Sequence, residues 1–259
     1  MIRLKSQTQI DGIAAAGAIV AEVLATVQDH AAPGISTGSL DQTAEELIRN
    51  HRGASPAFKG LYDFPGTLCT SINSEIVHGV PSLKRRLEYG DLLSVDVGVR
   101  LHGVVADAAV TFAVGEVSPD ADKLRRTAIR ALAAGVEAAR PGGRIGDIGA
   151  AISAEVMLAG FAVAEGLMGH GVGVEVHEDP RVPNFGVAGR GQLMRPGLVI
   201  AIEPMVVEGS DRIRTLDDGW TVATDDGGLS VHQEHTVAVT ADGPRILTAA
   251  PATVATRES

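Results

Sequence analysis

Residues 94–107 constrain the fold more than any other part of the chain, because apolar residues alternate with other types on both sides of His102-Gly103. Alternation with a period of two predicts two β-strands, and a tight turn at His102-Gly103 would join them into a hairpin. If the turn has two residues, Asp96 and Asp107 lie opposite each other or one diagonal step apart, and they share a face. A three-residue loop would place them on opposite faces.

Two carboxylates on one face of a sheet repel each other, so a compensating charge is needed. A hard divalent cation is the natural partner, because such ions prefer carboxylate oxygens. The alternative is a hairpin whose acids simply face solvent. The hairpin residues taken alone favour that alternative, so the metal hypothesis depends on the rest of the chain.

The composition indicates a globular protein with a large aliphatic core. The 259 residues are 45% hydrophobic but only 3% aromatic. A net charge of −10 argues against nucleic acid as the main ligand. Cys69 is the one cysteine in the sequence, which excludes an internal disulfide, and we expect a cytoplasmic location. We find no signal peptide and no apolar run of the length that a membrane span needs, so we expect no membrane contact.

Helices and strands are predicted in alternation along the chain. Apolar spacing and terminators predict helices over residues 7–30, from a cap at Thr37 or Ser39 to Arg52, over 120–139 and over 145–158. Besides the first hairpin, strands are predicted over residues 70–73, 76–81 and 198–205, with a second hairpin from Trp220 to Val239.

An internal repeat relates two parts of the chain. Ala32-Pro33-Gly34, with Gly38 and Leu40, matches Arg140-Pro141-Gly142, with Gly146 and Ile148, at a spacing of 108 positions. Each part runs helix, Pro-Gly, helix and then strands, which predicts two α/β halves related by a pseudo-twofold axis. No low-complexity linker separates the halves, at about 1–115 and 116–259, so we predict one catalytic domain over 1–259.

Seven ionisable side chains lie on or beside apolar strands. They are His78, Asp96, Asp107, His170, His177, Glu203 and Glu234. A single histidine of this kind is more often a satisfied core or edge residue than a ligand. Glu203 ends a five-residue apolar run, where a charge is costly unless it is paired or binds a metal. The ordered set, spread over both halves, points to a functional site.

Six motifs resemble those of the type I methionine aminopeptidases. The motifs are NSEIVHGVP (73–81), DLLSVDV (91–97), GHGVG (169–173), IEPM (202–205), DGWTV (218–222) and EHT (234–236). The similarity extends from the first helix to about Thr248. It implies an α/β (more specifically α+β) pita-bread fold, with antiparallel sheet flanked by helices. It also implies removal of the initiator methionine from nascent polypeptides whose second residue is small.

The resemblance also implies roles for individual residues. Two divalent metal ions (cobalt, manganese or iron, and less readily zinc or nickel) would be bound by Asp96, Asp107, His170, Glu203 and Glu234. His78 and His177 would contact the substrate and the reaction intermediate without binding metal. The methionine pocket would consist of Phe58, Leu61, Phe64, Cys69, Val176 and Trp220.

Elementary chemistry agrees with these roles. Four carboxylates and one imidazole supply four negative charges for two divalent ions, which can share a hydroxide that attacks the first peptide carbonyl. Glu203 is the expected proton shuttle, and His177, with His78, would donate hydrogen bonds to the oxyanion. An oxygen-rich donor set does not select zinc as thiolates would.

Several positions depart from the family pattern without removing a ligand. Val105-Ala106 precede Asp107, and Gln233 stands where an aromatic residue is common. Leu61 and Val176 are smaller than the family's usual aromatic residues, which predicts a wider methionine pocket. For partners we expect nascent chain N-termini, encountered near the ribosomal exit tunnel by a monomer.

Two other functions share parts of this pattern. An Xaa-Pro aminopeptidase has similar ligands but usually an additional N-terminal domain, whereas here the first helix is predicted almost at Met1. A binding protein without catalytic activity would be expected to have lost ligands, and this chain has all five.

Overall fold

The structure is a computed structural model that describes residues 2–249. Within this range the helices are α1 (Gln7–His30), α2 (Thr37–Asn50), α3 (Pro119–Ala138) and α4 (Ile145–Leu158), with one 3₁₀ turn, η1 (Leu61–Asp63). The strands before α3 are β1 (Ala54–Pro56), β2 (Leu68–Ile72), β3 (Glu75–Val77), β4 (Leu92–Leu101) and β5 (Val104–Ala113). The strands after α4 are β6 (Ala162–Val163), β7 (Met168–Gly171), β8 (Glu178–Pro183), β9 (Val199–Ile202), β10 (Met205–Val207), β11 (Ile213–Thr215), β12 (Val222–Thr224), β13 (Ser230–His232), β14 (His235–Thr240) and β15 (Gly243–Ile246).

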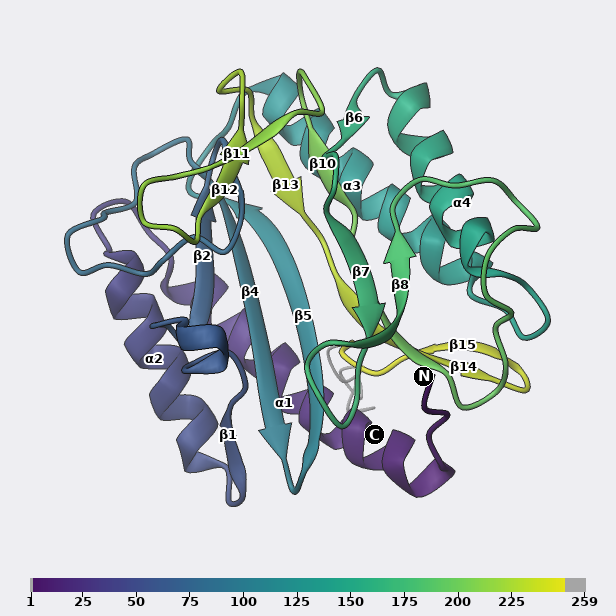
Figure 1. Cartoon of the computed structure of the whole chain (residues 1–259). Helices are drawn as coiled ribbons and strands as arrows, with labels where there is room; N and C mark the ends of the chain where they lie inside the picture. Colours follow the sequence, from purple (N-terminus) through teal and green to yellow (C-terminus); the bar gives the residue numbers. More distant parts are fainter. Residues whose placement is uncertain (1, 250–259) are drawn as a thin grey trace, which may run out of the picture.

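The four helices lie behind the strands in the view of Figure 1, and the other side of the strands is open. A four-stranded sheet contains β1, β4, β2 and β5, and a five-stranded sheet has the order β15-β14-β9-β7-β8. Two three-stranded sheets, β13-β10-β6 and β11-β12-β3, accompany them. All of these strand pairs are antiparallel.

Local sequence signals account for the helix ends. Ser6 and Gln9 form a capping box at the start of α1, in which each side chain accepts a hydrogen bond from the other residue's backbone N–H. The cap of α2 is Ser36, whose side chain accepts a hydrogen bond from the N–H of Ser39. The prediction of Thr37 or Ser39 as this cap is therefore wrong, because the chain already turns into the helix at Ser36.

The first hairpin forms as predicted. β4 and β5 pair on either side of a two-residue turn in which His102 (φ 48°) and Gly103 (φ 87°) both have positive φ. Such values suit the turns that match the twist of paired strands. In this register Asp96 faces Ala109, and Asp107 faces Gly98. The two carboxylates thus lie one diagonal step apart on the same face.

Two of the later strand predictions need correction. The strand predicted over 198–205 is interrupted, because Glu203-Pro204 separates β9 from β10. The hairpin predicted from Trp220 to Val239 is wrong. β12 pairs with β11 and β3, β13 pairs with β10, and β14 pairs with β9 and β15. Most of these partners are distant in sequence, so local alternation identifies strands there without identifying their neighbours.

The repeat in the sequence has a counterpart in the structure. The bounds of α2 and α4 are 108 positions apart at both ends, and α1 and α3 end at residues with the same spacing. Isolated bridges also occur at matching places, Ser36 with Arg86 and Arg144 with Leu193. The single domain over 1–259 remains a prediction, and its last residues, 250–259, lie outside the described part of the chain.

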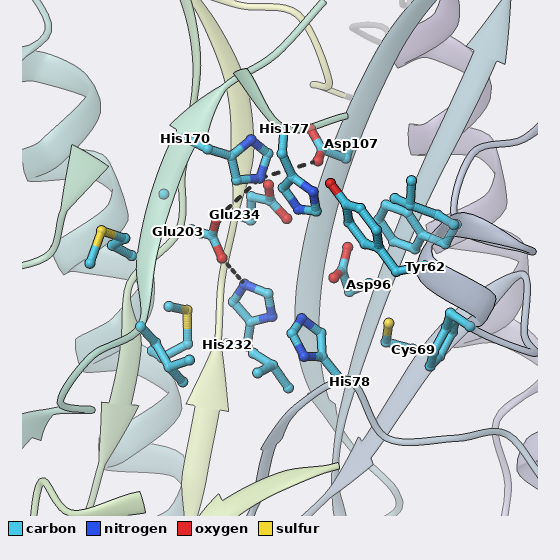
Figure 2. Close-up of a pocket in the computed structure, with 18 of the residues that line it drawn as sticks. Tyr62, Cys69, His78, Asp96, Asp107, His170, His177, Glu203, His232 and Glu234 are labelled. Atoms are coloured by element: carbon cyan, nitrogen blue, oxygen red, sulfur yellow. Dashed lines mark ion pairs between the residues drawn. The ribbon is translucent and has the colours of Figure 1, made fainter. Parts of the chain in front are cut away.

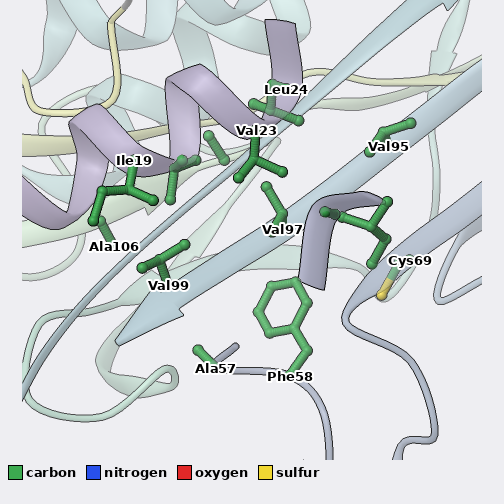
Figure 3. Close-up of a cluster of buried hydrophobic side chains, with 14 of the residues drawn as sticks. Ile19, Val23, Leu24, Ala57, Phe58, Cys69, Val95, Val97, Val99 and Ala106 are labelled. Atoms are coloured by element: carbon green, nitrogen blue, oxygen red, sulfur yellow. The ribbon is translucent and has the colours of Figure 1, made fainter. Parts of the chain in front are cut away.

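Each half has an aliphatic core between its helices and strands. In the first half, Ile19, Val23 and Leu24 of α1 lie in one buried cluster with Val97 and Val99 of β4 (Figure 3). Full burial of such a side chain contributes about 1.5–3 kcal/mol. This packing determines which face of β4 is left for Asp96, namely the face that points away from α1.

Helix α1 is long and apolar enough to cross a bilayer by length and composition, which contradicts the expectation that no apolar run has the required length. Half of its most apolar stretch is buried within the fold. A core helix of this kind passes the same test of length and hydropathy, so hydropathy alone decides nothing about a membrane.

Candidate metal centre

An open cavity of about 820 Å³ lies on the open side of the strands, with walls from both halves (Figure 2). All seven ionisable residues singled out in the sequence line it: His78, Asp96, Asp107, His170, His177, Glu203 and Glu234. The structure therefore brings together residues that are up to 156 positions apart in the chain.

Strands of the first half position two of the carboxylates. Asp96 comes from β4 and Asp107 from β5, and both are buried or nearly so. The backbone around Asp107 is held from the other half, because its N–H donates to Thr236 Oγ1 (3.1 Å) and Thr236 Oγ1 donates to its carbonyl oxygen (2.8 Å).

The remaining members come from strand ends of the second half. His170 lies on β7, Glu203 directly follows β9, and Glu234 lies between β13 and β14. The side chain of Asn184 donates to the carbonyl oxygen of Glu203 (2.9 Å), and the N–H of Glu234 donates to the carbonyl oxygen of Ala109 (2.8 Å). These backbone contacts fix where each side chain begins.

Donor atoms of Asp107, His170 and Glu234 all lie within 4.8 Å of one another. His170 Nε2 is 3.7 Å from Asp107 Oδ2 and 3.4 Å from Glu203 Oε1. His170 Nδ1 lies 3.0 Å from the carbonyl oxygen of Gly171, to which it must donate because a carbonyl only accepts. That hydrogen bond leaves Nε2 directed at the carboxylates, the arrangement usual for metal-binding histidines.

The buried carboxylates oppose one another's ionisation. Burial raises the pKa of Asp96 to about 8, and nearby carboxylates add to the effect against the opposing influence of His232. Burial likewise raises the pKa of Asp107 to about 6, although His170 lowers it. Burial and the neighbouring carboxylates raise the pKa of Glu234 well above its ordinary value. The cluster therefore carries more latent negative charge than its protein neighbours balance.

This donor set fits divalent cations. Within the described residues, Asp96 Oδ1 is buried and has no hydrogen-bond partner. Four carboxylates and one imidazole are ligands that borderline and hard divalent ions accept, and their charge matches two such ions. An ion bound here would provide a partner for Asp96 Oδ1 and would reduce the repulsion among the carboxylates.

Two further histidines border the cluster. His177 lies in the loop between β7 and β8, with its ring centroid 4.5 Å from that of His170. Partial burial in the cavity, together with His170 and His78, lowers the pKa of His177 to about 4. The ring is therefore neutral near pH 7 and retains one N–H that can donate. His78 follows β3 with a positive φ of 61°, which turns the chain at the cavity wall.

An apolar recess adjoins the ionisable cluster. Five of the six residues predicted for the methionine pocket line it: Phe58, Leu61, Phe64, Cys69 and Trp220. Phe64 and Trp220 meet edge to face, with ring centroids 5.1 Å apart. Val176 is buried in the same cluster as Phe58, Phe64 and Cys69, but it is not among the residues that line the cavity. Its assignment to the methionine pocket stays a prediction.

Tyr62 and His232 are among the cavity-lining residues that the predicted site did not include. Tyr62 has a φ of 51° and stacks on His177 at 6.0 Å between ring centroids, and nothing in the local pattern predicts that conformation. His232 is 2% exposed and lies 3.4 Å from Glu203 through Nε2. Its partner Glu203 is 29 positions earlier in the chain and follows another strand, so no local pattern identified His232.

Comparison with known proteins agrees with this geometry. Residues 11–241 match the profile of metallopeptidase family M24. A methionine aminopeptidase of Clostridium perfringens is 49% identical over 248 residues, covering 96% of this chain and 99% of the relative. Methionine aminopeptidase 1 of Mycobacterium tuberculosis is 47% identical over 251 residues and covers 94% of both chains.

Solved structures support the same assignment. The methionine aminopeptidase of Thermotoga maritima superposes with a TM-score of 0.94 at 40% identity, covering 96% of this chain and 99% of that one. A prolidase of Pyrococcus furiosus, at 24% identity, a TM-score of 0.79 and coverage of 96% and 66%, shows the fold alone. The pita-bread fold is thereby confirmed. The chain belongs to metallopeptidase family M24 and, within it, to the methionine aminopeptidases.

Proposed function

We propose that the chain removes the initiator methionine from nascent polypeptides whose second residue is small. One observation carries the proposal: five buried or half-buried side chains of the metal-ligand type adjoin an uncharged aromatic recess in one open cavity. A cluster of this kind suits peptide hydrolysis, and the recess suits an apolar side chain beside it.

Five residues would hold two divalent ions: Asp96, Asp107, His170, Glu203 and Glu234. Cobalt, manganese and iron suit the oxygen-rich set, with zinc and nickel as further candidates. When bound, such ions supply an activated water and a polarised peptide carbonyl.

Protein groups would perform the proton transfers and stabilise charge. A carboxylate oxygen of Glu203 would take the proton of the attacking water and return it to the leaving amine. The neutral ring of His177 would donate its N–H to the oxyanion that forms at the carbonyl, and His78 would assist from the opposite wall.

The recess explains the choice of first residue. Its lining residues Phe58, Phe64, Cys69 and Trp220 carry no charge, so a Lys, Asp or Glu side chain would be buried there unpaired. An unbranched, polarisable methionine side chain fits such a surface. Because Leu61 is small for this pocket, we expect more tolerance of leucine and norleucine. The second residue would lie close to the ionisable cluster and would have to be small.

The same proposal includes the setting of the reaction. The substrates would be N-termini emerging near the ribosomal exit tunnel, and the enzyme would act as a cytoplasmic monomer without a nucleic-acid site. The net charge of −10 argues against nucleic acid as the main ligand.

A series of tripeptides that varies the first two residues tests this function. We expect the highest kcat/KM for methionine followed by Gly, Ala or Ser, and little hydrolysis of methionine followed by Lys or Trp. Metal content is measured on the same samples. Efficient release of residues other than methionine from Xaa-Pro peptides, or equal rates for Met-Ala and Met-Trp peptides, would contradict the proposal.

A further inference from the structure

We propose that His232 is a positioning residue for Glu203, to which it donates a hydrogen bond from Nε2 to Oε2. The inference rests on the proposed function only in that Glu203 is taken as the carboxylate that handles the proton. It assigns to His232 a task that neither the motifs nor the predicted ligand set includes.

The contact itself places Glu203 between two imidazole rings. His232 Nε2 lies 3.4 Å from Glu203 Oε2, and His170 Nε2 lies 3.4 Å from Glu203 Oε1 (Figure 2). Each oxygen of the carboxylate thus faces a different imidazole nitrogen. Holding Oε2 on one side leaves Oε1 directed toward His170 and the other members of the cluster.

Among the described residues, no other hydrogen bond occupies Nε2 of His232. Its side chain is 2% exposed, so water does not reach it freely, and within residues 2–249 Nε2 makes no hydrogen bond of ordinary geometry. At 3.4 Å the pair is slightly longer than a normal N–H···O bond. A small rotation of either side chain would close it, and a buried donor gains by doing so.

The backbone of His232 is fixed by Thr111. Thr111 Oγ1 donates to the carbonyl oxygen of His232 (2.8 Å) and accepts from its N–H (3.0 Å). Ser94 Oγ lies 2.7 Å from Thr111 Oγ1. Because the single hydroxyl proton of Thr111 goes to His232, Ser94 is the donor in that pair. A histidine held this firmly can hold another side chain in turn.

The pseudo-twofold axis relates this arrangement to a matching one in the first half of the chain. Residues of β5 match residues 125 positions later in the chain: Asp107 with His232, Ala109 with Glu234, and Thr111 with Thr236. Thr236 holds the backbone of Asp107 through the same two hydrogen bonds that Thr111 makes to His232. The hydrogen bond from the N–H of Glu234 to the carbonyl oxygen of Ala109 lies between them.

His232 therefore occupies the position in the second half that the predicted ligand Asp107 occupies in the first. The fold provides a fixed backbone from which a side chain is directed into the cavity at both places. In the first half that side chain is a carboxylate, and in the second it is a ring with a donor aimed at a carboxylate.

Three substitutions distinguish a His232 side chain that positions Glu203 from one that only fills space in the core. His232→Gln places an amide N–H near the position of Nε2, whereas His232→Asn reaches only as far as Nδ1, and His232→Leu has no donor. We expect His232→Leu and His232→Asn to lower kcat on a Met-Ala-Ser peptide by roughly 10–100-fold, the range for loss of a group that orients a ligand. His232→Gln should recover most of that loss.

A second readout does not depend on turnover. The visible absorption of the protein loaded with Co²⁺ reports how Glu203 is oriented, so His232→Leu and His232→Asn should shift the band and His232→Gln should restore it. His51→Leu serves as the matched control, because His51 makes a comparable contact with Glu22 (3.1 Å) at the exposed surface, away from the cavity. That variant should change neither readout.

The double variant tests the role of Thr111. If Thr111 acts through His232, Thr111→Val should reproduce part of the effect, and Thr111→Val with His232→Leu should lose no more than His232→Leu alone. An unchanged Co²⁺ spectrum and kcat in His232→Leu would overturn the proposal. Equal losses in the Gln and Asn variants would also overturn it, and this pair decides the matter if the Leu variant does not fold.

The outcome for His232 is distinguishable from the outcome for the proposed function. If the wild-type protein hydrolyses no methionine peptide, yet the Co²⁺ spectra still separate His232→Gln from His232→Asn, the function fails and the positioning role stands. If the peptides are cleaved and the spectra of all three variants match the wild type, the positioning role fails and the function stands.

Discussion

At the scale of single residues, the main feature of the cavity is its excess of carboxylates over positively charged groups. Asp107 and Glu234 are buried and Asp96 is half-buried, and loss of solvent raises the pKa of all three. Neighbouring carboxylates are unfavourable in a protein interior, because each ionised carboxylate makes the next one harder to ionise. Bound cations would favour the ionised form of all three carboxylates. Because the ligands act together, removing one of them should weaken the binding of both ions.

We predict that Asp107→Ala lowers the metal content of the purified protein and reduces kcat by more than the roughly 10–100-fold expected for an outer-shell group. The fold should persist, which circular dichroism would show. Atomic absorption gives the number of ions per chain. Asp11→Ala is the matched control, because Asp11 is an exposed carboxylate paired with Arg245 (3.2 Å). Full activity of Asp107→Ala with two ions per chain would contradict the assignment.

His177 is expected to stabilise a negative charge, the oxyanion of the reaction intermediate, whereas the carboxylates stabilise bound cations. We predict that His177→Ala lowers kcat by roughly 10²–10³ with little change in KM, as for the loss of one oxyanion donor. Because its pKa is about 4, the donor should be neutral across pH 6–8 and should add no step to the pH profile there. A variant in which KM alone rises would show that His177 binds substrate without stabilising the intermediate.

At the scale of elements, a buried ion pair connects the N-terminal segment to the loop that carries His177. Lys5 Nζ donates to Glu178 Oε2, and both side chains are almost fully buried, at 2% and 6% exposure. Glu178 Oε1 accepts from the N–H groups of Val174 and Glu175. The segment before α1 thus helps to fix the loop between β7 and β8.

Breaking this ion pair should be costly. We predict that Lys5→Met lowers the free energy of unfolding by about 3–5 kcal/mol, because it leaves a buried carboxylate without its partner. Replacing both residues by methionine should cost less than Lys5→Met alone, since no charge is then left unpaired. Urea denaturation measures each value. A double variant no more stable than Lys5→Met would contradict this account.

The same ion pair has a pH signature. Burial opposes ionisation of Glu178, but the hydrogen bonds from Lys5 and the two backbone N–H groups outweigh it and lower its pKa. A carboxyl with a lowered pKa stabilises the fold above its unfolded value of about 4.3 and loses that contribution as pH falls through the folded value. The stability gap between wild type and Glu178→Gln should therefore shrink below about pH 4. A gap that stays constant to pH 3 would contradict the prediction.

At the scale of the whole molecule, the candidate metal centre joins the two halves. Asp96 and Asp107 come from the first half, and His170, Glu203 and Glu234 come from the second. Ions bound to all five would cross-link two sheets that otherwise meet mainly along β5 and residues 232–236. Metal binding should accordingly stabilise the complete fold in addition to supporting catalysis.

We predict that chelation of divalent ions lowers the Tm and that returning Mn²⁺ or Co²⁺ restores it. An ion at 100 times its Kd stabilises the protein that binds it by about 2.7 kcal/mol. Differential scanning calorimetry at several ion concentrations would measure the shift. Asp107→Ala should show a smaller shift than the wild type, and an equal shift in both would place the stabilising ion elsewhere.

Much of this protein follows from local sequence. The predicted bounds of α1 and α4 agree with the structure, because apolar spacing and the terminators Pro33-Gly34 and Gly160 act within a few residues of each helix end. The hairpin of β4 and β5 was predicted, and a two-residue turn was expected to place Asp96 and Asp107 either opposite each other or one diagonal step apart on one face. The observed register is the diagonal one. The members of the metal centre were predicted from the order and spacing of their motifs along the chain.

Only the tertiary structure decided the rest. Pairing in the region from Trp220 to Val239 depends mostly on partners far away in sequence, and the burial of Val176 depends on a cluster that it shares with residues of the first half. His232 acquires its place from a twofold relation to Asp107 that no local pattern contains. Alternation along a strand tells which residues share a face, but the free energy that selects a neighbouring strand comes from contacts between distant segments, and those contacts exist only once the chain is folded.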